Sequence, residues 1–256
     1  MKRNLVLLIL SGSMALLWAS CQKNELNHST EAALSDKTAA VQVSKKGPQS
    51  CFSGTYIDTM HYNNTPQLYI FNGNQYTRYD VLANTFNGVT SISNYPNMPF
   101  GSIDASYVDY WHYGGRPQLY MFSGNQYARY DMKNNSFEGT TAITNFPNMP
   151  FTSVDAAYVD TWHYGGRPQL YLFSGNRYAR YDILANTFEG TTSITNFPNM
   201  PFTSVDAAYV DTWHYGGRPQ LYLFSGGIYA RYDIWANTYE GVNTVASGYA
   251  GSPFCH

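Results

Sequence analysis

A repeat of 51 residues constrains the fold of this 256-residue chain more than any other feature. The sequence from Phe151 to Tyr164 recurs almost unchanged from Phe202 to Tyr215, and a near copy begins at Phe100. Units 100–150 and 151–201 are identical at 40 of 51 positions, and a more divergent unit precedes them. Internal repeats of this kind are typical of folds built from copies of one supersecondary unit. The chain therefore contains four such units, at about 51–99, 100–150, 151–201 and 202–255.

Each unit has the pattern of several short β-strands. In the third unit we expect strands at Val154–Trp162, Gln169–Phe173 and Tyr178–Asp182, separated by glycine-rich turns, and a weaker fourth at Phe188–Ile194. Aromatic residues make up 17% of the chain and charged residues 12%, a composition that excludes disorder over the whole chain. Four-stranded units of about 50 residues are the size of β-propeller blades, so the fold class is predicted as all-β.

The strand sequences resemble the hemopexin repeat. Its marks are a D-A-A-aromatic first strand, a Y-x-F-x-G hairpin and a Y-x-R-Y-D third strand. The third unit has them in Asp155–Tyr158, Tyr171–Gly175 and Tyr178–Asp182, and three of the four units carry them closely; the first has Ser53 and Gly54 in place of Asp and Ala. The kelch repeat, of similar length, places its Gly-Gly pair elsewhere. The resemblance covers about 51–255 and implies a four-bladed propeller around a central channel.

Two cysteines support a closed ring. Cys51 and Cys255 are separated by 204 residues, four times the repeat length, so they occupy the same phase of the repeat. One circuit of a four-bladed ring returns the chain to its start, which would make them neighbours, as a disulfide requires. Hemopexin domains are similar in having a disulfide between the first and last blades. We therefore expect Cys51 and Cys255 to be bonded.

The resemblance also implies a cation site in the channel. In hemopexin-like domains the main-chain carbonyl of the first-strand Asp binds a cation, often calcium, and groups two residues further on form a second ring. By position the first ring is Ser53, Asp104, Asp155 and Asp206, and the second is Thr55, Ser106, Ala157 and Ala208. Main-chain oxygens suit calcium or another hard cation. The alternative is that these small residues only fill a narrow centre.

One histidine ends the first strand of each unit: His61, His112, His163 and His214. Four histidines could ligate a transition metal or haem iron. Strand ends lie at the rim of a propeller, however, where equivalent residues are far apart, so we expect each to cap its own turn or to pack on Trp111, Trp162 or Trp213. Haem is not expected, because the haem site of hemopexin lies between two propellers and this chain has one.

Arginines recur at two positions. Those of the third strand, Arg78, Arg129, Arg180 and Arg231, are expected to pair with Asp or with aromatic faces inside the sheet. The others follow the first strand and, with the histidines, form a candidate ligand surface: His112, Arg116, His163, Arg167, His214 and Arg218, with Thr65 at the arginine position of the first unit. Surfaces of this kind suit recognition, and three near-identical copies suit a polymeric ligand. A recent duplication would leave the same pattern.

The N-terminal sequence has the pattern of an export signal. A basic start at Lys2 and Arg3 precedes the apolar run Leu5–Trp18, which is short for a membrane span and suits a signal peptide. The segment Leu17–Cys21 resembles the lipobox of bacterial lipoproteins, in which the cysteine is lipidated. We therefore expect a signal peptide at 1–20, a lipid on Cys21 and a flexible tether at 21–50. The alternative is ordinary secretion.

These features together predict a binding module. The net charge of −2 argues against nucleic-acid binding. The motifs of a nucleophile elbow, a zinc protease, a phosphate loop and a dinucleotide site are missing from the sequence, so no enzymatic activity is expected. We expect a membrane-anchored lipoprotein at the outer membrane or cell surface of a Gram-negative bacterium, binding an extracellular or periplasmic protein, glycan or matrix ligand. The alternatives are a haem or metal acquisition lipoprotein and a structural surface protein.

Overall fold

The computed structural model describes residues 50–95 and 97–255. The predicted signal peptide, the predicted tether up to residue 49 and Cys21 lie outside the described residues. In the described part of the chain, no helix is long and apolar enough to cross a membrane.

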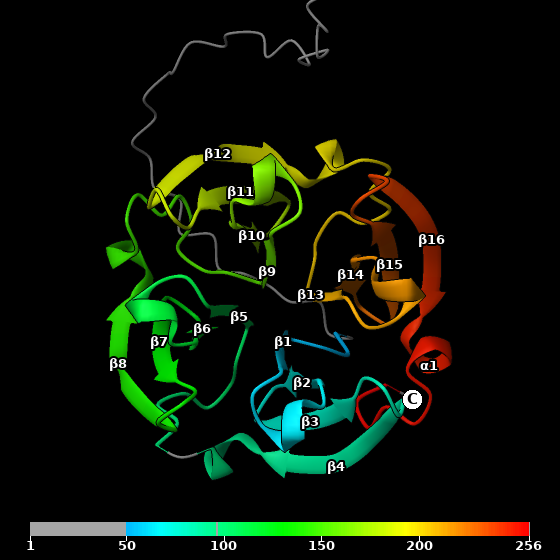
Figure 1. Cartoon of the computed structure of the whole chain (residues 1–256), viewed down its shortest axis with the longest axis horizontal. Helices are drawn as coiled ribbons and strands as arrows, with labels where there is room; N and C mark the ends of the chain where they lie inside the picture. The colour runs from blue at the N-terminus through cyan, green and yellow to red at the C-terminus, as the bar shows by residue number, and fades with distance from the viewer. Residues whose placement is uncertain (1–49, 96, 256) are drawn as a thin grey trace, which may run out of the picture. The chain divides into compact units, whose positions relative to one another are not determined.

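The described residues form four antiparallel sheets of four strands each, arranged around one axis (Figure 1). Blade 1 contains β1 (Gly54–Asp58), β2 (Gln67–Asn72), β3 (Gln75–Asp80) and β4 (Thr85–Ser91). Blade 2 contains β5 (Ala105–Asp109), β6 (Gln118–Ser123), β7 (Gln126–Asp131) and β8 (Ser136–Ala142). Blade 3 contains β9 (Ala156–Asp160), β10 (Gln169–Ser174), β11 (Arg177–Asp182) and β12 (Thr187–Ser193). Blade 4 contains β13 (Ala207–Asp211), β14 (Gln220–Ser225), β15 (Ile228–Asp233) and β16 (Thr238–Thr244).

Short helical turns connect these strands. A 3₁₀ turn follows the first strand of each blade, at Tyr62–Asn64, Tyr113–Gly115, Tyr164–Gly166 and Tyr215–Gly217. Another follows the fourth strand of blades 1 to 3, at Ile92–Asn94, Ile143–Asn145 and Ile194–Asn196, and the short helix α1 (Val245–Gly248) takes this place in blade 4. The prediction of an all-β, four-bladed propeller is confirmed.

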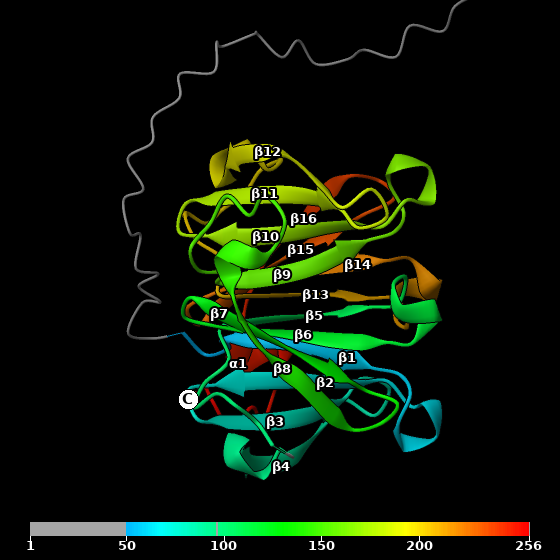
Figure 2. The same ribbon diagram turned by 90° about the vertical axis from the view of Figure 1, so that its left-hand side faces the viewer.

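The first strand of each blade is the innermost. Within a blade the strands pair in chain order, and β1, β5, β9 and β13 contact one another around the axis (Figure 1). The turns that leave these inner strands lie at one end of the propeller, opposite α1 (Figure 2). The inner strand β9 is shorter than the predicted Val154–Trp162, because the Asp160 side chain accepts hydrogen bonds from the amides of Trp162 and His163 and turns the chain there.

The hydrophobic core lies between adjacent blades. Tyr158 and Phe173 of blade 3, for example, pack in one cluster with Leu223 and Tyr232 of blade 4, and the other blade pairs form equivalent clusters. Within blade 3 the rings of Tyr158 and Tyr171 stack with centroids 4.8 Å apart. An aromatic pair of this kind contributes about 0.5–1.5 kcal/mol beyond its buried area. Aromatic packing therefore stabilises each blade and joins it to its neighbours.

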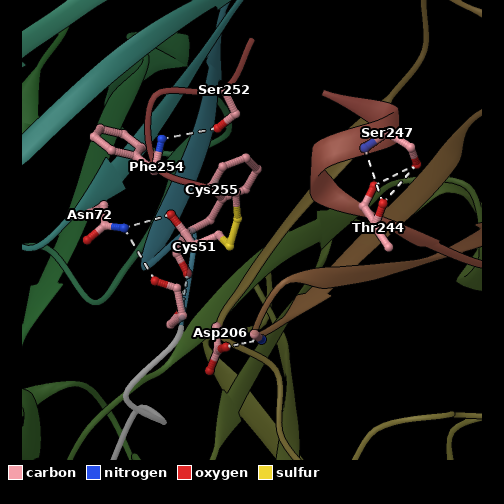
Figure 3. Close-up of a disulfide and its surroundings, with 11 residues drawn as sticks. Cys51, Asn72, Asp206, Thr244, Ser247, Ser252, Phe254 and Cys255 are labelled. Atoms are coloured by element: carbon pink, nitrogen blue, oxygen red, sulfur yellow. Dashed lines mark hydrogen bonds between the residues drawn. A yellow bond between two sulfur atoms is a disulfide. The ribbon is translucent and has the colours of Figure 1, made fainter. Parts of the chain in front are cut away.

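The ring is closed by a disulfide between Cys51 and Cys255, whose Cα atoms lie 5.4 Å apart (Figure 3). The Asn72 side-chain amide donates a hydrogen bond of 2.8 Å to the Cys51 carbonyl, which holds the segment before β1 against blade 1. Each blade consists of consecutive strands, so no sheet contains strands from both ends of the described chain. The predicted disulfide is confirmed, and it is the covalent link between the first and last blades.

Replacing Cys255 by Ser should lower the free energy of unfolding by about 4–5 kcal/mol, because the disulfide closes a loop of 204 residues. Denaturant titrations of the oxidised wild type and of the variant measure the loss. Reduced wild type should match the Cys51→Ser/Cys255→Ser double variant, and Cys21→Ser should leave the unfolding curve unchanged. Two titratable thiols at Cys51 and Cys255 in oxidised protein would contradict the closure.

Candidate functional site

A cavity of about 380 Å³ opens at the end of the axis where the inner strands finish. Its deep part is lined by side chains of the inner strands at the level of Thr55 and Ile57. Its mouth is lined by the residues that follow these strands: Thr59, Tyr110, Trp111, Thr161, Trp162, Thr212 and Trp213. Hydroxyl-bearing side chains and three indole rings thus line this end of the cavity together. A concave site that combines apolar rings with a few polar groups is the usual form of a small-ligand site.

Sequence reasoning missed the role of these tryptophans. The sequence predicts that each histidine caps its own turn or packs on Trp111, Trp162 or Trp213; the structure places all three tryptophans in the lining of the axial cavity. In the sequence, each tryptophan stands two residues after the Asp that ends the inner strand. That spacing could have indicated that the tryptophans occupy equivalent positions. The direction of the turn at the strand end decides where each indole ring lies.

The Asp at the end of each inner strand sets the direction of that turn. In blade 3 the Oδ1 atom of Asp160 accepts hydrogen bonds from the amides of Trp162 and His163, at 2.8 and 3.2 Å. Its Oδ2 atom lies 2.6 Å from Nδ1 of His163. The same Asp–His pair occurs in the other blades, at Asp58–His61, Asp109–His112 and Asp211–His214. Each histidine is therefore held by its own blade. In blade 3 the turn that it stabilises contains Trp162, which lines the cavity mouth.

The tyrosine after each histidine has a left-handed backbone. Tyr164 has φ of 56°, a conformation that is unfavourable for a bulky residue, and Gly165 continues it at 69°. Two contacts hold the ring in place: the Tyr164 hydroxyl lies 3.3 Å from that of Tyr171, and the Arg180 guanidinium lies 4.2 Å above the ring centroid. Tyr62, Tyr113 and Tyr215 have the same backbone conformation and a third-strand arginine over the ring.

The third-strand arginines have the expected aromatic partners but not the expected acid. Arg129, Arg180 and Arg231 form ion pairs with fourth-strand glutamates, Glu138, Glu189 and Glu240, rather than with Asp. The reason is geometric, because the glutamate lies on the adjacent fourth strand of the same blade.

Most large hydrophobic side chains that remain exposed lie at the same end as the cavity. They belong to the loops that follow the first and third strands, which antiparallel pairing brings to one end of each blade. We call these residues the aromatic face: Met60, Tyr62, Leu82, Tyr110, Tyr113, Tyr164, Leu184, Tyr215 and Trp235. The other exposed large hydrophobics of the described chain are Val89, Ile228 and Val242. The exposed large hydrophobic side chains of the described residues are therefore concentrated at the cavity end of the propeller.

The residues of the predicted first cation ring make local contacts with their side chains. The carboxylates of Asp104, Asp155 and Asp206 each accept a hydrogen bond of 2.7 Å from a hairpin glycine amide, those of Gly124, Gly175 and Gly226. Ser53 instead donates from its hydroxyl to the Ile103 carbonyl at 2.7 Å. These side chains therefore connect the segments that lead into the inner strands to hairpins and, from Ser53, to the segment before β5.

The second predicted ring is lined by main-chain oxygens and hydroxyls. Thr55 Oγ1 donates to the Ala208 carbonyl at 2.7 Å, and Ser106 Oγ donates to the Thr55 carbonyl at 3.1 Å. These bonds run between inner strands of neighbouring blades. Across the axis, Cα atoms of β1 and β9 come within 8 Å of each other, so the bore is narrow. Residues 50–95 and 97–255 contain no group of three or more His, Cys, Asp or Glu side chains able to hold a metal.

The comparisons with known proteins concern the propeller. No protein-family model matches the sequence. Matrix metalloproteinase-21 of Mus musculus is 28% identical over 192 residues, which cover 68% of this chain and 30% of the relative. The chain thus spans about a third of the length of that curated relative.

Solved structures with the same architecture include a hemopexin-fold protein from cow pea, with a TM-score of 0.60 and 23% identity over 78% of this chain and 96% of that one. An albumin from Cicer arietinum showing hemagglutination has a TM-score of 0.58 and 24% identity, covering 77% and 94% of the two chains. A plant lectin with two metal-binding sites, from the same species, has a TM-score of 0.58 and 23% identity, covering 77% and 95%. These likenesses confirm the expected hemopexin-like fold.

The arginines of the predicted ligand surface are ion-paired to buried carboxylates. Arg167 and Arg218 lie 2.7 and 2.5 Å from Asp182 and Asp233, and Arg116 pairs with Asp131 in the same way. Burial alone would raise the pKa of Asp182. The Ala185 amide, the Gln169 side chain and the Arg167 guanidinium outweigh burial and hold the pKa of Asp182 below its ordinary value of 3.8. About half of each arginine side chain remains exposed.

Replacing Asp182 by Asn should lower the free energy of unfolding at pH 7 by about 1–3 kcal/mol, because a charged hydrogen-bonded pair is lost. A lowered carboxyl pKa stabilises the fold above the unfolded-state pKa, near 4, and the contribution disappears as the pH falls through the folded-state pKa. Thermal melts from pH 7 to pH 3 should therefore show the variant and wild type converging in acid. Asp80→Asn is the matched control, with a smaller loss at pH 7, since Thr65 replaces the arginine there. A difference between Asp182→Asn and wild type that stays constant with pH would contradict this.

Proposed function

Because the chain is a hemopexin-like propeller, we propose that it acts as a binding module whose ligand docks in the axial cavity, and that this ligand is a glycan. The observation that carries the proposal is that Trp111, Trp162 and Trp213 line the cavity mouth together with threonine residues.

The chemistry of the mouth suits a sugar. One face of a pyranose ring carries C–H groups that pack against an indole ring, while its hydroxyls need hydrogen-bond partners at the edge. The tryptophans supply the apolar faces, and Thr59, Thr161 and Thr212 supply hydroxyls between them. A volume of about 380 Å³ has room for one or two sugar rings. The half-exposed tyrosines of the aromatic face would extend contacts along a longer chain, which fits a polymeric ligand with repeated sites.

Two solved structures of the same fold agree with this choice. One is described as a plant lectin and another as an albumin showing hemagglutination.

The propeller is proposed to function outside the cytoplasm, on a lipid anchor. The basic and apolar N-terminal sequence and the lipobox-like segment ending at Cys21 support export and lipidation. The disulfide between Cys51 and Cys255 agrees with an oxidising compartment. An anchored domain of this kind would hold its ligand at the outer membrane or cell surface.

A hard cation is proposed in the channel, held by main-chain oxygens. The donors present fit such an ion: the second ring offers carbonyls and hydroxyls of inner strands that already hydrogen-bond across neighbouring blades. Because the Asp155 carboxylate bonds to the Gly175 amide, the ligand would be a carbonyl oxygen rather than this side chain. The ion would hold the inner strands at fixed spacing at the deep end of the cavity, whose lining includes Thr55, Ser106, Ala157 and Ala208.

Replacing Trp162 by Ala should weaken glycan binding by at least about tenfold, since truncating a buried aromatic contact at an interface commonly costs 1–2 kcal/mol or more. A glycan array identifies a ligand of the wild type, and calorimetry on that ligand measures the change. Trp235→Ala, on the same face but outside the cavity lining, is the control and should bind as wild type does. Binding of proteins or haemin but no glycan, or unchanged binding by Trp162→Ala, would contradict the proposal.

Calcium should raise the melting temperature, with a stabilisation of about 2.7 kcal/mol at a hundredfold excess over Kd, and chelator should reverse it. Asp155→Asn should keep the calcium-dependent shift, because its side chain is not the ligand, and His163→Ala should keep it as well. A melt indifferent to calcium would contradict the channel site. Loss of a transition-metal shift in His163→Ala would favour the histidines instead.

A further inference from the structure

Blade 1 lacks an arginine that the other three blades have. In blades 2 to 4 the residue after the 3₁₀ turn is Arg116, Arg167 or Arg218, and it forms an ion pair with the Asp that ends the third strand. In blade 1 the same position of the repeat is Thr65, and the third strand ends in Asp80. Threonine cannot replace the guanidinium, so this carboxylate lacks the partner that its three counterparts have.

The backbone around the missing arginine is unchanged. Thr65 has φ and ψ of −75° and 121°, and Arg167 has −74° and 127°. The amide of Val81 donates to the Pro66 carbonyl at 3.1 Å, as Ile183 does to Pro168 at 3.2 Å. Only the side chain differs, and blade 1 therefore keeps the geometry of an arginine site without the arginine.

The Asp80 carboxylate is oriented like the others. Its Oδ1 atom accepts the amides of Leu82 and Ala83 at 3.1 and 2.9 Å, and Asp182 accepts the amide of Ala185 at 2.9 Å. Hydrogen bonds from the Ala83 amide, from Gln67 and from the Leu82 amide, with a smaller contribution from the positive charge of Arg78, keep the pKa of Asp80 below its ordinary value despite the opposing effect of burial. The carboxylate is thus held in place with its charge intact.

Solvent reaches Asp80 but not its counterparts. Asp131, Asp182 and Asp233 are buried, whereas Asp80 is partly exposed. The described residues provide Asp80 with no ion pair. The nearest basic side chain on its strand, Arg78, is held over the Tyr62 ring at 4.0 Å. Blade 1 also has Asn87 in place of the glutamate of the other blades, and Asn87 bonds to Gln67 at 3.3 Å.

We propose that Asp80 receives the guanidinium of an arginine from a partner protein, which would occupy the position that Arg167 occupies in blade 3. The occupant is an arginine because the chain itself fills this position with arginine three times. A planar guanidinium can also donate two parallel hydrogen bonds to a carboxylate, which an ammonium group cannot.

The surroundings of Asp80 suit a protein partner. Tyr62 and Leu82 flank the site on the aromatic face and are 42% and 55% exposed. A single partly exposed ion pair contributes little affinity alone, so the arginine acts as one anchor of a larger contact that also covers these apolar side chains. This site is separate from the lining of the axial cavity.

The test measures binding of N-acetyl-arginine amide to full-length protein by saturation-transfer NMR. The neutral citrulline analogue is the control ligand. Wild type should bind the arginine probe weakly and the citrulline analogue not at all. Thr65→Arg should abolish binding, because its own guanidinium fills the site, and should raise the melting temperature. Arg167→Thr should open a second site at Asp182 and about double the bound probe.

Two further variants separate this site from the glycan site. Trp162→Ala should leave arginine binding unchanged, and Thr65→Arg should leave glycan binding unchanged. Absence of binding by wild type, equal binding of arginine and citrulline, full binding by Thr65→Arg, or no gain in Arg167→Thr would each overturn the proposal. A raised melting temperature in Thr65→Arg would show that its loss of binding is not caused by unfolding.

Discussion

The first and last blades must meet, because the hydrophobic clusters of this fold lie between adjacent blades. Cluster contacts between blade 4 and blade 1 include Phe52 with Phe224 and Tyr249, with ring centroids 4.8 and 5.7 Å apart. Without closure these rings would be exposed to water. The disulfide from Cys51 to Cys255 prevents the two ends from separating, and the inner strands around the axis depend on that closure for their spacing. The cavity they enclose is therefore a property of the closed ring.

The Asp at the end of each inner strand connects this architecture to the proposed binding site. Its two carboxylate oxygens bond to the next turn and to the histidine, as Asp160 does with Trp162 and His163. In three blades this turn places a tryptophan at the cavity mouth. The same short motif thus ends a strand, fixes a histidine and positions a ring. This explains why the histidines recur without forming a shared metal site in the described residues.

Departures from the repeat distinguish the blades from one another. Blade 1 has Met60 where the other blades have tryptophan, Thr65 where they have arginine and Asn87 where they have glutamate. Four identical blades would present four identical surfaces, so these substitutions make the surface of blade 1 different from those of the other blades. Blade 1 accordingly contributes no tryptophan to the lining of the axial cavity, and its third strand ends in a carboxylate that solvent reaches.

The repeat and the cysteine spacing determined the four blades, the strand order within each and the disulfide, because strand pairing and ring closure follow from local patterns repeated at one interval. The sequence also indicated that Arg180 and its equivalents meet aromatic rings. Only the tertiary structure decided that Trp111, Trp162 and Trp213 converge on one cavity, and that Arg167 is bound to Asp182 while Asp80 stays open. These outcomes depend on the direction of turns and on contacts between residues of different strands and blades, which no spacing along the chain specifies.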